Sequence, residues 1–187
     1  MTGSREMTGV RELPIEGRLV RLRDCAPADA DMLDRWNADR DGGFNDFGPR
    51  EPVPREALAN GPLRNERNGM LIIERLVDRT PIGTMGWRRV QNYGPSPVSD
   101  AWSIGIELIL EGRGQGYGTE AQRLVADFLF ATTAANRVEA STDADNVAEQ
   151  RALEKAGFRR EGTLRGAQFR AGSFHDLVSY ARVRGDP

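Results

Sequence analysis

The sequence predicts one α/β (α+β) domain in which a mixed central sheet of about seven strands carries helices on both faces. A length of 187 residues fits a single domain. The first half of the chain contains strand patterns arranged as a hairpin, whereas the second half alternates strand and helix patterns. This order is typical of a mixed sheet rather than a fully parallel one. Residues 1–14 alternate charged residues with Gly and Thr, so we expect a loose N-terminal arm before a domain at 15–187.

The elements of the first half follow from periodicity and from Pro and Gly. Pro27 suits the first turn of a helix. Six Gly and Pro residues around Phe44 and Phe47 predict a long irregular loop with apolar anchors. The expected order is a strand at 17–23, a helix from Pro27 to about Asn37, a loop at 41–54, a short helix at 55–60, and a hairpin of strands 70–77 and 82–90.

The second half alternates after a loop at 91–100 that is rich in Pro, Gly and Ser. Trp87 and Trp102 fall in strand patterns, so we expect both to belong to the core or to an interface. The expected elements are a strand at 102–110, a helix at 116–133, a strand at 137–142, a helix at 146–156, and two strands, one from Phe158 and one from about Phe174 to Val183.

Composition argues against several classes of protein. A net charge of −2 with a pI near 5.6 lacks the basic surplus of a general nucleic-acid binder. No apolar run approaches the length of a membrane span, and the N-terminus has no apolar signal region. With only Cys25 and His175, neither an internal disulfide nor a Cys-His zinc site is expected. We therefore expect a reduced, cytoplasmic protein without a metal, in which Cys25 is a packed residue rather than a nucleophile.

The most informative stretch is a glycine-rich turn between a strand and a helix. Gly114, Gly116 and Gly118 leave unhindered N–H groups where a helix begins, which is a place that favours an anion such as a phosphate. The alternative is that the glycines only make a tight connection. The spacing fits neither a Walker loop nor a dinucleotide fingerprint. The flanking apolar rows are Ile104, Ile106, Leu108 and Leu110 on the strand, and Ala121, Leu124, Val125, Phe128 and Leu129 on the helix.

Three ordered motifs resemble the GNAT superfamily of acyl-CoA N-acyltransferases. Arg113-Gly-Gln-Gly-Tyr-Gly118 is similar to its pyrophosphate loop, and Asn146-Val-Ala-Glu-Gln-Arg-Ala-Leu-Glu-Lys-Ala-Gly-Phe158 is similar to its second motif. A third group of residues resembles the C-terminal arm of the RimJ/RimL-like branch, namely Glu161 to Arg165, Gly172, Asp176 and Tyr180. The resemblance covers about residues 17–184. It implies a GNAT-like mixed sheet and transfer of an acetyl group from acetyl-CoA directly to a primary amine, either a protein N-terminus or a small molecule.

The resemblance also implies which residues hold acetyl-CoA. Backbone groups of Leu108, Ile109 and Leu110 would pair with the pantetheine arm, and Asn146 would contact its amides. Arg151 would reach a phosphate or, equally, belong to a solvated helix face. The residues implied for the pyrophosphate are Arg113, Gly114, Gln115, Gly116, Tyr117, Gly118 and Thr119.

The chain departs from the second motif at two positions. Glu149 replaces the usual Ser, and Leu153 stands where several GNAT enzymes carry a Tyr that protonates the departing thiolate. Glu149 also has a structural interpretation, because Asn146 and Glu149 are spaced as a capping box whose helix Gly157 would end. The catalytic acid is therefore left unassigned.

Acetyl transfer needs a neutral amine, a proton acceptor and donors to the carbonyl oxygen. Glu107 is the first candidate for the base, because Gly105 beside it leaves room for a substrate; the alternative is an exposed strand carboxylate. His175 and Asp176 are a second candidate pair, or else a structural one. Tyr180 can donate a proton or simply pack.

The acceptor site is expected between the first helix and the loop at 41–54. Aromatic walls and one acidic group there suit an ammonium-bearing substrate; the alternative is a loop that is simply pinned by its Phe residues. The candidates are Trp36, Asn37, Phe44, Asn45, Asp46 and Phe47. A second hypothesis is a non-catalytic acyl-CoA-binding sensor or regulatory module. We expect no nucleic-acid or membrane partner, and a homodimer is left open.

Overall fold

The computed structural model describes residues 12–38, 43–44, 52–53, 55–90, 94, 96 and 99–186. Its described strands form a single sheet of eight strands in the order β1-β2-β3-β4-β5-β6-β8-β7. Only β5 and β6 run parallel, and every other neighbouring pair is antiparallel. The mixed sheet predicted from the sequence is therefore confirmed.

The first half of the chain supplies one side of the sheet. A short strand that the sequence pattern did not indicate, β1, accounts for the eighth strand, and it pairs with the start of β2. Pro27 opens a 3-10 turn, η1, as expected for its position. The elements are β1 (Ile15–Glu16), β2 (Val20–Asp24), η1 (Pro27–Asp29), α1 (Ala30–Ala38), α2 (Arg55–Ala59), β3 (Asn68–Arg75) and β4 (Pro81–Val90).

The second half alternates strands and helices and ends in a hairpin. The elements are β5 (Ala101–Leu108), a 3-10 turn η3 (Leu110–Gly112), α3 (Tyr117–Thr132), β6 (Arg137–Asp143), α4 (Val147–Lys155), β7 (Arg159–Arg170) and β8 (Ser173–Val183). The strand expected at 102–110 ends two residues earlier, at Leu108. Ile109 donates its N–H to the Ile82 carbonyl oxygen, and Leu110 turns out into solvent, where 63% of it is exposed.

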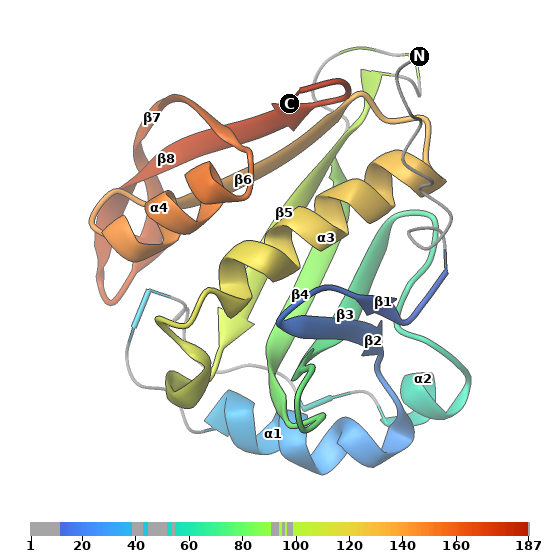
Figure 1. Ribbon diagram of the computed structural model, residues 1–187. Coiled ribbons are helices and arrows are strands. Elements are labelled where there is room, and N and C mark those ends of the chain that lie inside the picture. Colours follow the sequence, from blue (N-terminus) through green and yellow to red (C-terminus); the bar gives the residue numbers. More distant parts are fainter. Residues whose placement is uncertain are drawn as a thin grey trace.

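Alternate residues of β3 show that helices cover both faces of the sheet. Leu71 and Ile73 pack in the large core with the apolar stripe of α3, whereas Ile72, between them, packs with Leu33 of α1 and Leu58 of α2. Successive side chains of a strand point to opposite faces, so α1 and α2 lie on one face and α3 and α4 on the other. Figure 1 shows α3 crossing in front of the strands and α1 at the lower end of the view.

Expected core residues are buried on the α3 face. Trp87 and Trp102 are each 7% exposed, and the indole nitrogen of Trp102 donates to the Thr133 hydroxyl at 3.1 Å. Cys25, in the smaller core on the other face, is buried as expected, and burial raises the pKa of its thiol to about 12. A thiol with such a pKa is a poor nucleophile at neutral pH.

The two parallel strands in the middle of the sheet separate soon after they meet. The β5–β6 ladder consists of three pairs, Ala101↔Arg137, Trp102↔Val138 and Ser103↔Glu139. Beyond Ser103, β5 continues to Leu108 along β4, and β6 continues to Asp143 along β8. Figure 1 shows the two strands diverging below this point. The separation opens the sheet between α3 and α4.

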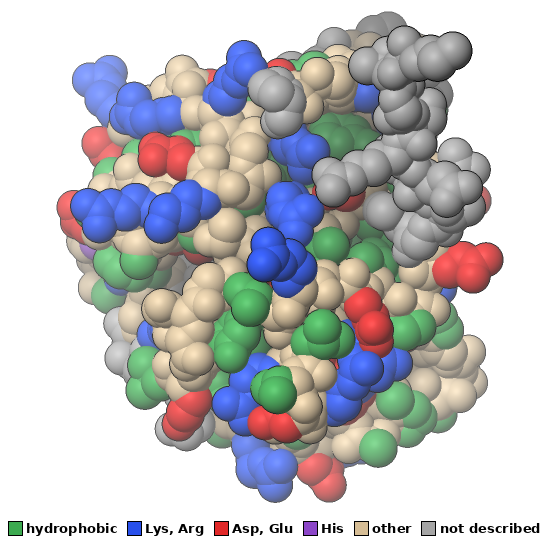
Figure 2. All heavy atoms as spheres, in the orientation of Figure 1, with side chains coloured by type: hydrophobic (Ala, Val, Ile, Leu, Met, Phe, Trp, Pro, Cys, Tyr) green, Lys and Arg blue, Asp and Glu red, His purple; other side chains and the backbone are tan. Residues whose placement is uncertain are grey.

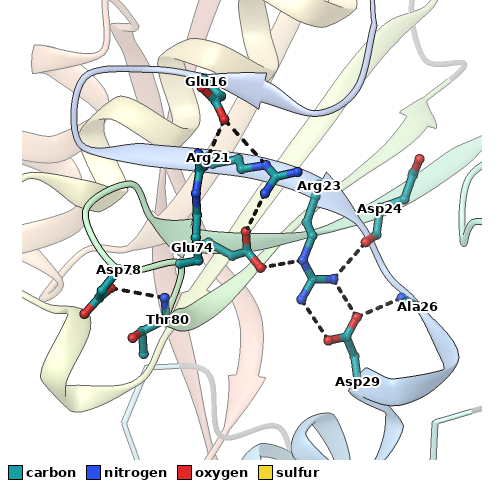
Figure 3. A network of polar contacts seen from close by, with 10 residues as sticks. Glu16, Arg21, Arg23, Asp24, Ala26, Asp29, Glu74, Asp78 and Thr80 are labelled. Atoms are coloured by element: carbon teal, nitrogen blue, oxygen red, sulfur yellow. Dashed lines mark hydrogen bonds and ion pairs between the residues drawn. The ribbon is translucent and has the colours of Figure 1, made fainter.

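An ion-pair network fixes the start of α1 to the sheet. Arg23 on β2 donates to both carboxylate oxygens of Asp29 in η1, at 2.6 and 2.8 Å, and to Glu74 of β3 at 2.5 Å (Figure 3). Asp29 also accepts the Ala26 N–H. Burial works to raise the pKa of Asp29, but these donors outweigh it and hold the pKa below its usual value. The network sets where α1 leaves the sheet.

Candidate functional site

One cleft of about 1280 Å³ runs through the place where β5 and β6 separate. Its walls come from the end of β5 and the glycine turn, from β6 and α4, and from α1 with the adjoining strands β3 and β4. The cleft therefore reaches from the start of α3 on one face to the α1 side of the other. A cavity of this size exceeds what a typical drug-sized ligand fills. It has room for a long, flexible ligand together with a second molecule.

The glycine turn forms one end of the cleft. Gly114 and Gly116 have φ values of +75° and +85°, in the left-handed region that favours glycine, and Gly116 is the N-cap of α3. A Cβ atom on Gly114 would meet nothing within 4 Å, so the surface above the turn is open. The first N–H groups of α3 have no acceptor within the helix and lie at its positive end. The turn thus has the properties of an anion site.

Two side chains of the turn are engaged in holding its shape. Arg113 Nε donates to the Leu108 carbonyl oxygen at 3.0 Å, and Gln115 Nε2 donates to the Glu111 carbonyl oxygen at 2.9 Å. Gln115 and Tyr117 do not line the cleft, and Tyr117 packs against the large core. Gln115 and Tyr117 therefore offer the anion site only backbone groups, whereas Arg113 itself lines the cleft.

The second motif forms α4, whose start lines the cleft beside β6. Asn146 is its N-cap, and Asn146 Oδ1 accepts the Glu149 N–H at 3.2 Å. The reciprocal bond of a capping box is absent, because the Asn146 N–H donates to the Asp143 carbonyl oxygen instead. At the other end, Gly157 has φ +92° and the Phe158 N–H reaches the Leu153 carbonyl oxygen, which closes the helix as a Schellman motif.

Glu149 points into the cleft rather than back onto the helix cap. Burial raises the pKa of its carboxyl to about 7, and the Gln122 side chain of α3 partly opposes that rise. Gln122 is 1% exposed and lines the same cleft. Its Nε2 atom has no hydrogen-bond partner of acceptable geometry within the described part of the chain. A partly protonated carboxyl and the Gln122 amide thus meet where the two helices face each other.

Glu107 faces the α1 side of the sheet. In the ladder, Ile72 pairs with Thr84 and Thr84 pairs with Glu107, so these three side chains share the face that α1 and α2 cover. Glu107 is half-buried and lines the cleft. Gly105 and Gly86, paired on adjacent strands, leave open space beside it, since a Cβ on Gly105 would meet nothing within 4 Å.

His175 and Asp176 are separated by the alternation of β8. His175 Nδ1 lies 3.4 Å from Asp143 Oδ2 and 3.3 Å from Arg170 Nη2, whereas Asp176 accepts the Gly166 N–H. Burial works to raise the pKa of Asp143, but the Asp145 N–H, Arg170 and His175 outweigh it and hold the pKa low. His175 therefore belongs to a buried ion-pair cluster with Asp143, and only Asp143 of that cluster lines the cleft.

Tyr180 and Leu153 lie in the core behind the cleft. Tyr180 is fully buried, its hydroxyl donates to Glu154 Oε1 at 3.2 Å, and burial is the first cause of its raised pKa. Leu153 is likewise 0% exposed. Neither side chain lines the cleft. No phenol is thus placed at either position to act on a ligand in it.

At the α1 end, aromatic side chains enclose the cleft. Trp36, Asn37 and Phe44 line it, and the Arg170 guanidinium lies over the Phe44 ring, 5.2 Å from its centroid. The other candidates for this end, Asn45, Asp46 and Phe47, lie outside the described residues.

Most of the predicted acetyl-CoA residues meet in this one cleft. Those that line it are Leu108, Ile109, Leu110, Arg113, Gly114, Gly116, Gly118, Thr119, Asn146 and Arg151. Sequence reasoning missed Gln122, Asp143 and Gln168, which also line it. Gln122 did carry a signal, because it is a polar residue next to Ala121 and near Leu124 in the buried stripe of α3. Nothing local distinguishes Asp143 and Gln168.

Within the described ranges, no helix has the length and apolar character needed to cross a membrane. Nor does any group of three or more His, Cys, Asp or Glu side chains within those ranges have an arrangement that could hold a metal ion. On the face that carries α3 and α4, basic and acidic side chains are interspersed (Figure 2).

Comparisons with known proteins show the family of the chain. The acetyltransferase (GNAT) domain model matches residues 19–159. The uncharacterised N-acetyltransferase YoaA of Bacillus subtilis (strain 168) is 30% identical over 112 residues, which are 60% of this chain and 60% of that protein. The matched segment thus spans less than two thirds of that relative.

Solved structures share the fold. Ribosomal-protein-S5-alanine acetyltransferase from Vibrio fischeri superposes with a TM-score of 0.76 at 18% identity, covering 94% of this chain and 98% of that one. Spermidine N-acetyltransferase from Vibrio cholerae, in complex with CoA and spermine, has a TM-score of 0.75 at 18% identity, covering 91% and 98%. Because the family model covers most of the chain, from β2 to the start of β7, the chain belongs to the GNAT acetyltransferase family.

Proposed function

We propose that the protein is an N-acetyltransferase that uses acetyl-CoA and transfers the acetyl group directly to a primary amine. The observation that carries the proposal is the single cleft that joins an anion site at the start of α3 to the Glu107 face of the sheet, through the gap between β5 and β6. A donor with a phosphate end and a reactive far end fits such a passage. An acceptor can meet that reactive end from the α1 side.

The donor would be held mainly by backbone groups. The N–H groups of the Gly114–Thr119 turn would bind the pyrophosphate, and Asn146 would contact the pantetheine amides while it caps α4. Ile109 already gives its N–H to Ile82, and the Leu108 carbonyl oxygen accepts from Arg113. Pairing of this segment with the pantetheine arm is therefore restricted to its remaining backbone groups. When bound, acetyl-CoA supplies the activated acetyl group.

Glu107 is the proposed proton acceptor, directly or through a water. It lies on the acceptor face, and open space beside Gly105 admits an amine. An α-amine titrates near 8 and a lysine-type amine near 10, so the second kind of acceptor needs more help. His175, Asp176 and Tyr180 are weaker candidates because each side chain has a partner within the protein and none of the three lines the cleft.

The acceptor class follows from the α1 end. Trp36 and Phe44 offer aromatic faces in the cleft that Glu107 also lines, which suits an ammonium-bearing molecule. We place the protein in the RimJ/RimL-like branch from its C-terminal motif. The fold neighbours named above are an acetyltransferase of ribosomal protein S5 and one of spermidine, so both a protein N-terminus and a small polyamine belong in the test. A cytoplasmic location and a homodimer remain predictions.

Thiol release from acetyl-CoA with a panel of amines tests the function. The panel contains peptides with free N-termini, polyamines and aminoglycosides. Turnover with at least one class is expected, and binding of acetyl-CoA without turnover on any of them would instead support the sensor module. Leu153, which removes the phenol from α4, is the observation in favour of that second candidate.

Gly118→Asp tests the placement of the phosphates, with Gly118→Asn as a neutral control of the same size. A Cβ at Gly118 would lie 3.4 Å from Leu108 Cδ1, so a side chain can be added with little movement. The carboxylate of the Asp variant would face the pyrophosphate, and like-charge repulsion should weaken acetyl-CoA binding by at least tenfold relative to the Asn variant. Equal affinities in calorimetry would remove the phosphates from this turn.

A further inference from the structure

The cleft holds one carboxyl that the proposed reaction has not used. Glu149, in the first turn of α4, points into the cleft and meets Gln122 of α3. Its position is not explained by helix capping, because the Asn146 N–H that it would cap bonds to Asp143 instead. A carboxyl held partly out of solvent without a structural duty has a cost to folding, which suggests a functional reason for its presence.

Gln122 is the buried side chain that Glu149 meets across the two helices. It is 1% exposed, and its amide favours the charged form of the carboxyl, although the contact lacks the geometry of a full hydrogen bond. Because Gln122 lines the cleft, this contact is made at the surface that a bound molecule would touch.

Transfer of the acetyl group leaves a thiolate that needs a proton. The amine nitrogen forms a bond to the acetyl carbon and loses its proton to Glu107, while the carbon–sulfur bond breaks and its electron pair stays on sulfur. A thiolate whose thiol has a pKa well above 7 takes up a proton at neutral pH, and a positioned acid that supplies this proton as the bond breaks speeds the reaction. Leu153 cannot do this, and Tyr180 is bonded to Glu154 outside the cleft.

We propose that Glu149 is the catalytic acid of this chain, which donates its carboxyl proton to the sulfur of coenzyme A as the carbon–sulfur bond breaks, and that Gln122 positions that carboxyl. The inference rests on the proposed function. Glu149 is then a carboxylate and recovers its proton from solvent when the product leaves. Gln122 is a positioning residue, since it acts through Glu149.

The other carboxyls of the cleft are less suited to this role. Asp143 is held as a carboxylate by Arg170 and His175. Glu107 lies on the opposite, acceptor side of the sheet, and Glu111 is exposed in the turn. Glu149 differs because burial holds its pKa near 7, so a large fraction is protonated at neutral pH.

Other charged groups around Glu149 do not set its protonation. The charged residues that line the same cleft are Glu107 on β5, Glu111 and Arg113 in the turn, Asp143 on β6, and Arg151 and Lys155 on α4. The causes of the shift at Glu149 are burial, which raises the pKa, and the neutral Gln122 amide, which lowers it. The acid is therefore governed by the contact between α3 and α4.

The decisive variant is Glu149→Gln, with Glu154→Gln as its control on the same helix. Glu154 is exposed, and a Gln there can still accept the Tyr180 hydroxyl. We expect kcat of the Glu149 variant to fall by about 10²-fold or more, the usual worth of a positioned acid, while its Kd for acetyl-CoA changes by less than about threefold. Glu154→Gln should keep both constants. An amine acceptor that is already neutral at pH 6 prevents its own titration from masking the profile.

Two pH measurements separate an acid from a residue that only packs. The parent rate should fall above an apparent pKa near 7, and this alkaline limb should disappear in Glu149→Gln. Independently of activity, carboxyl-labelled glutamate should show in NMR one resonance that titrates near pH 7 in the ligand-free parent and is missing in the variant. Gln122→Met should move the alkaline limb to higher pH, because it removes the group that lowers the pKa of Glu149.

The proposal fails if folded Glu149→Gln keeps the parent's kcat and alkaline limb, or if all glutamates of the parent titrate below pH 5.5. It also fails if the variant loses acetyl-CoA affinity as much as rate, which would make Glu149 a binding residue. If Glu149→Gln does not fold, the proposal is tested by the NMR titration of the parent and by the shift of the alkaline limb in Gln122→Met. A parent that releases no thiol with any amine overturns the proposed function instead, so the two failures are distinguishable.

Discussion

Replacing Glu120 by Gln should destabilise the protein and loosen the glycine turn. Glu120 is 6% exposed, and its Oε1 atom accepts the Arg18 N–H at 2.9 Å. Its Oε2 atom accepts the N–H groups of Leu19 at 2.6 Å and Val20 at 2.9 Å. A single carboxylate of α3 therefore binds the start of β2. Gln keeps the size but turns an amide nitrogen toward at least one of the three donors.

The magnitude follows from the kind of bond lost. A hydrogen bond to a charged group contributes about 1.5–3 kcal/mol and a neutral one about 1 kcal/mol. Losing one bond, and the charge on the acceptor of the other two, should lower the free energy of unfolding by about 3 kcal/mol. In a chain of this size that corresponds to a fall in Tm of about 6–12 °C.

Thermal unfolding followed by circular dichroism measures this loss, with Glu66→Gln, at an exposed turn position, as the control. Calorimetry with acetyl-CoA should also show weaker binding, because a Cβ built on Gly116 of the phosphate turn would lie 3.5 Å from Leu19 Cδ1, which places the turn against the segment that Glu120 holds. A Tm within 2 °C of the parent, or an equal fall in Glu66→Gln, would refute the role given to the carboxylate.

Three further variants test the site and the network around α1. Asn146→Asp keeps a good N-cap, so Tm should hold while KM for acetyl-CoA rises; steady-state kinetics with an unchanged KM would reduce Asn146 to capping. Glu107→Gln should lower kcat by about 10²-fold and remove the acid limb of the pH profile without weakening acetyl-CoA binding, and a retained limb would shift the role of base elsewhere. Asp29→Asn should cost about 3 kcal/mol at pH 7, because it breaks the bidentate pair with Arg23. Since the pKa of Asp29 is lowered in the folded state, its stabilisation is present above pH 4 and is lost as the pH falls further. The difference in the free energy of unfolding between parent and variant, measured with urea, should therefore shrink below pH 4. A constant difference would contradict this.

Local patterns were sufficient for most of the fold. The glycine turn, the apolar stripe of α3 and the Asn146 and Gly157 ends of α4 depend on residues a few positions apart, and all are found where the sequence places them. The end of β5 is different. Leu108 to Leu110 continue an apolar strand pattern, yet Ile109 bonds to Ile82 on β4, a contact that periodicity does not report.

His175 and Asp176, expected as a catalytic pair, do not face each other, because side chains alternate along a strand. His175 and Asp176 are neighbours on β8, so their side chains point to opposite faces. The carboxylate beside His175 is Asp143, across the ladder on β6. Adjacency in a strand therefore argues against a His-Asp pair, whereas the partner of each side chain has to be sought on the neighbouring strand.

Glu149 shows how one spacing allows two structures and how the tertiary contact chooses between them. The step of three residues from Asn146 suits a capping box, and half of that box forms. The carboxyl itself turns away, toward Gln122, which is 27 positions earlier in the chain and on another helix. Only the packing of α4 against α3 brings these two side chains together.

The pKa values of two carboxyls that line the cleft are shifted in opposite directions. The side chain of Asp143 is only 2% exposed, but Arg170 lies 2.6 Å away and stabilises the charged form. Glu149 meets a neutral amide, which cannot offset the loss of water around a carboxylate. Opposite shifts in adjoining carboxyls assign separate roles to them. Asp143 stays charged and holds Arg170, which in turn lies over the Phe44 ring at the acceptor end. Glu149 keeps a proton near neutral pH, so it is the carboxyl that can give one to a leaving sulfur.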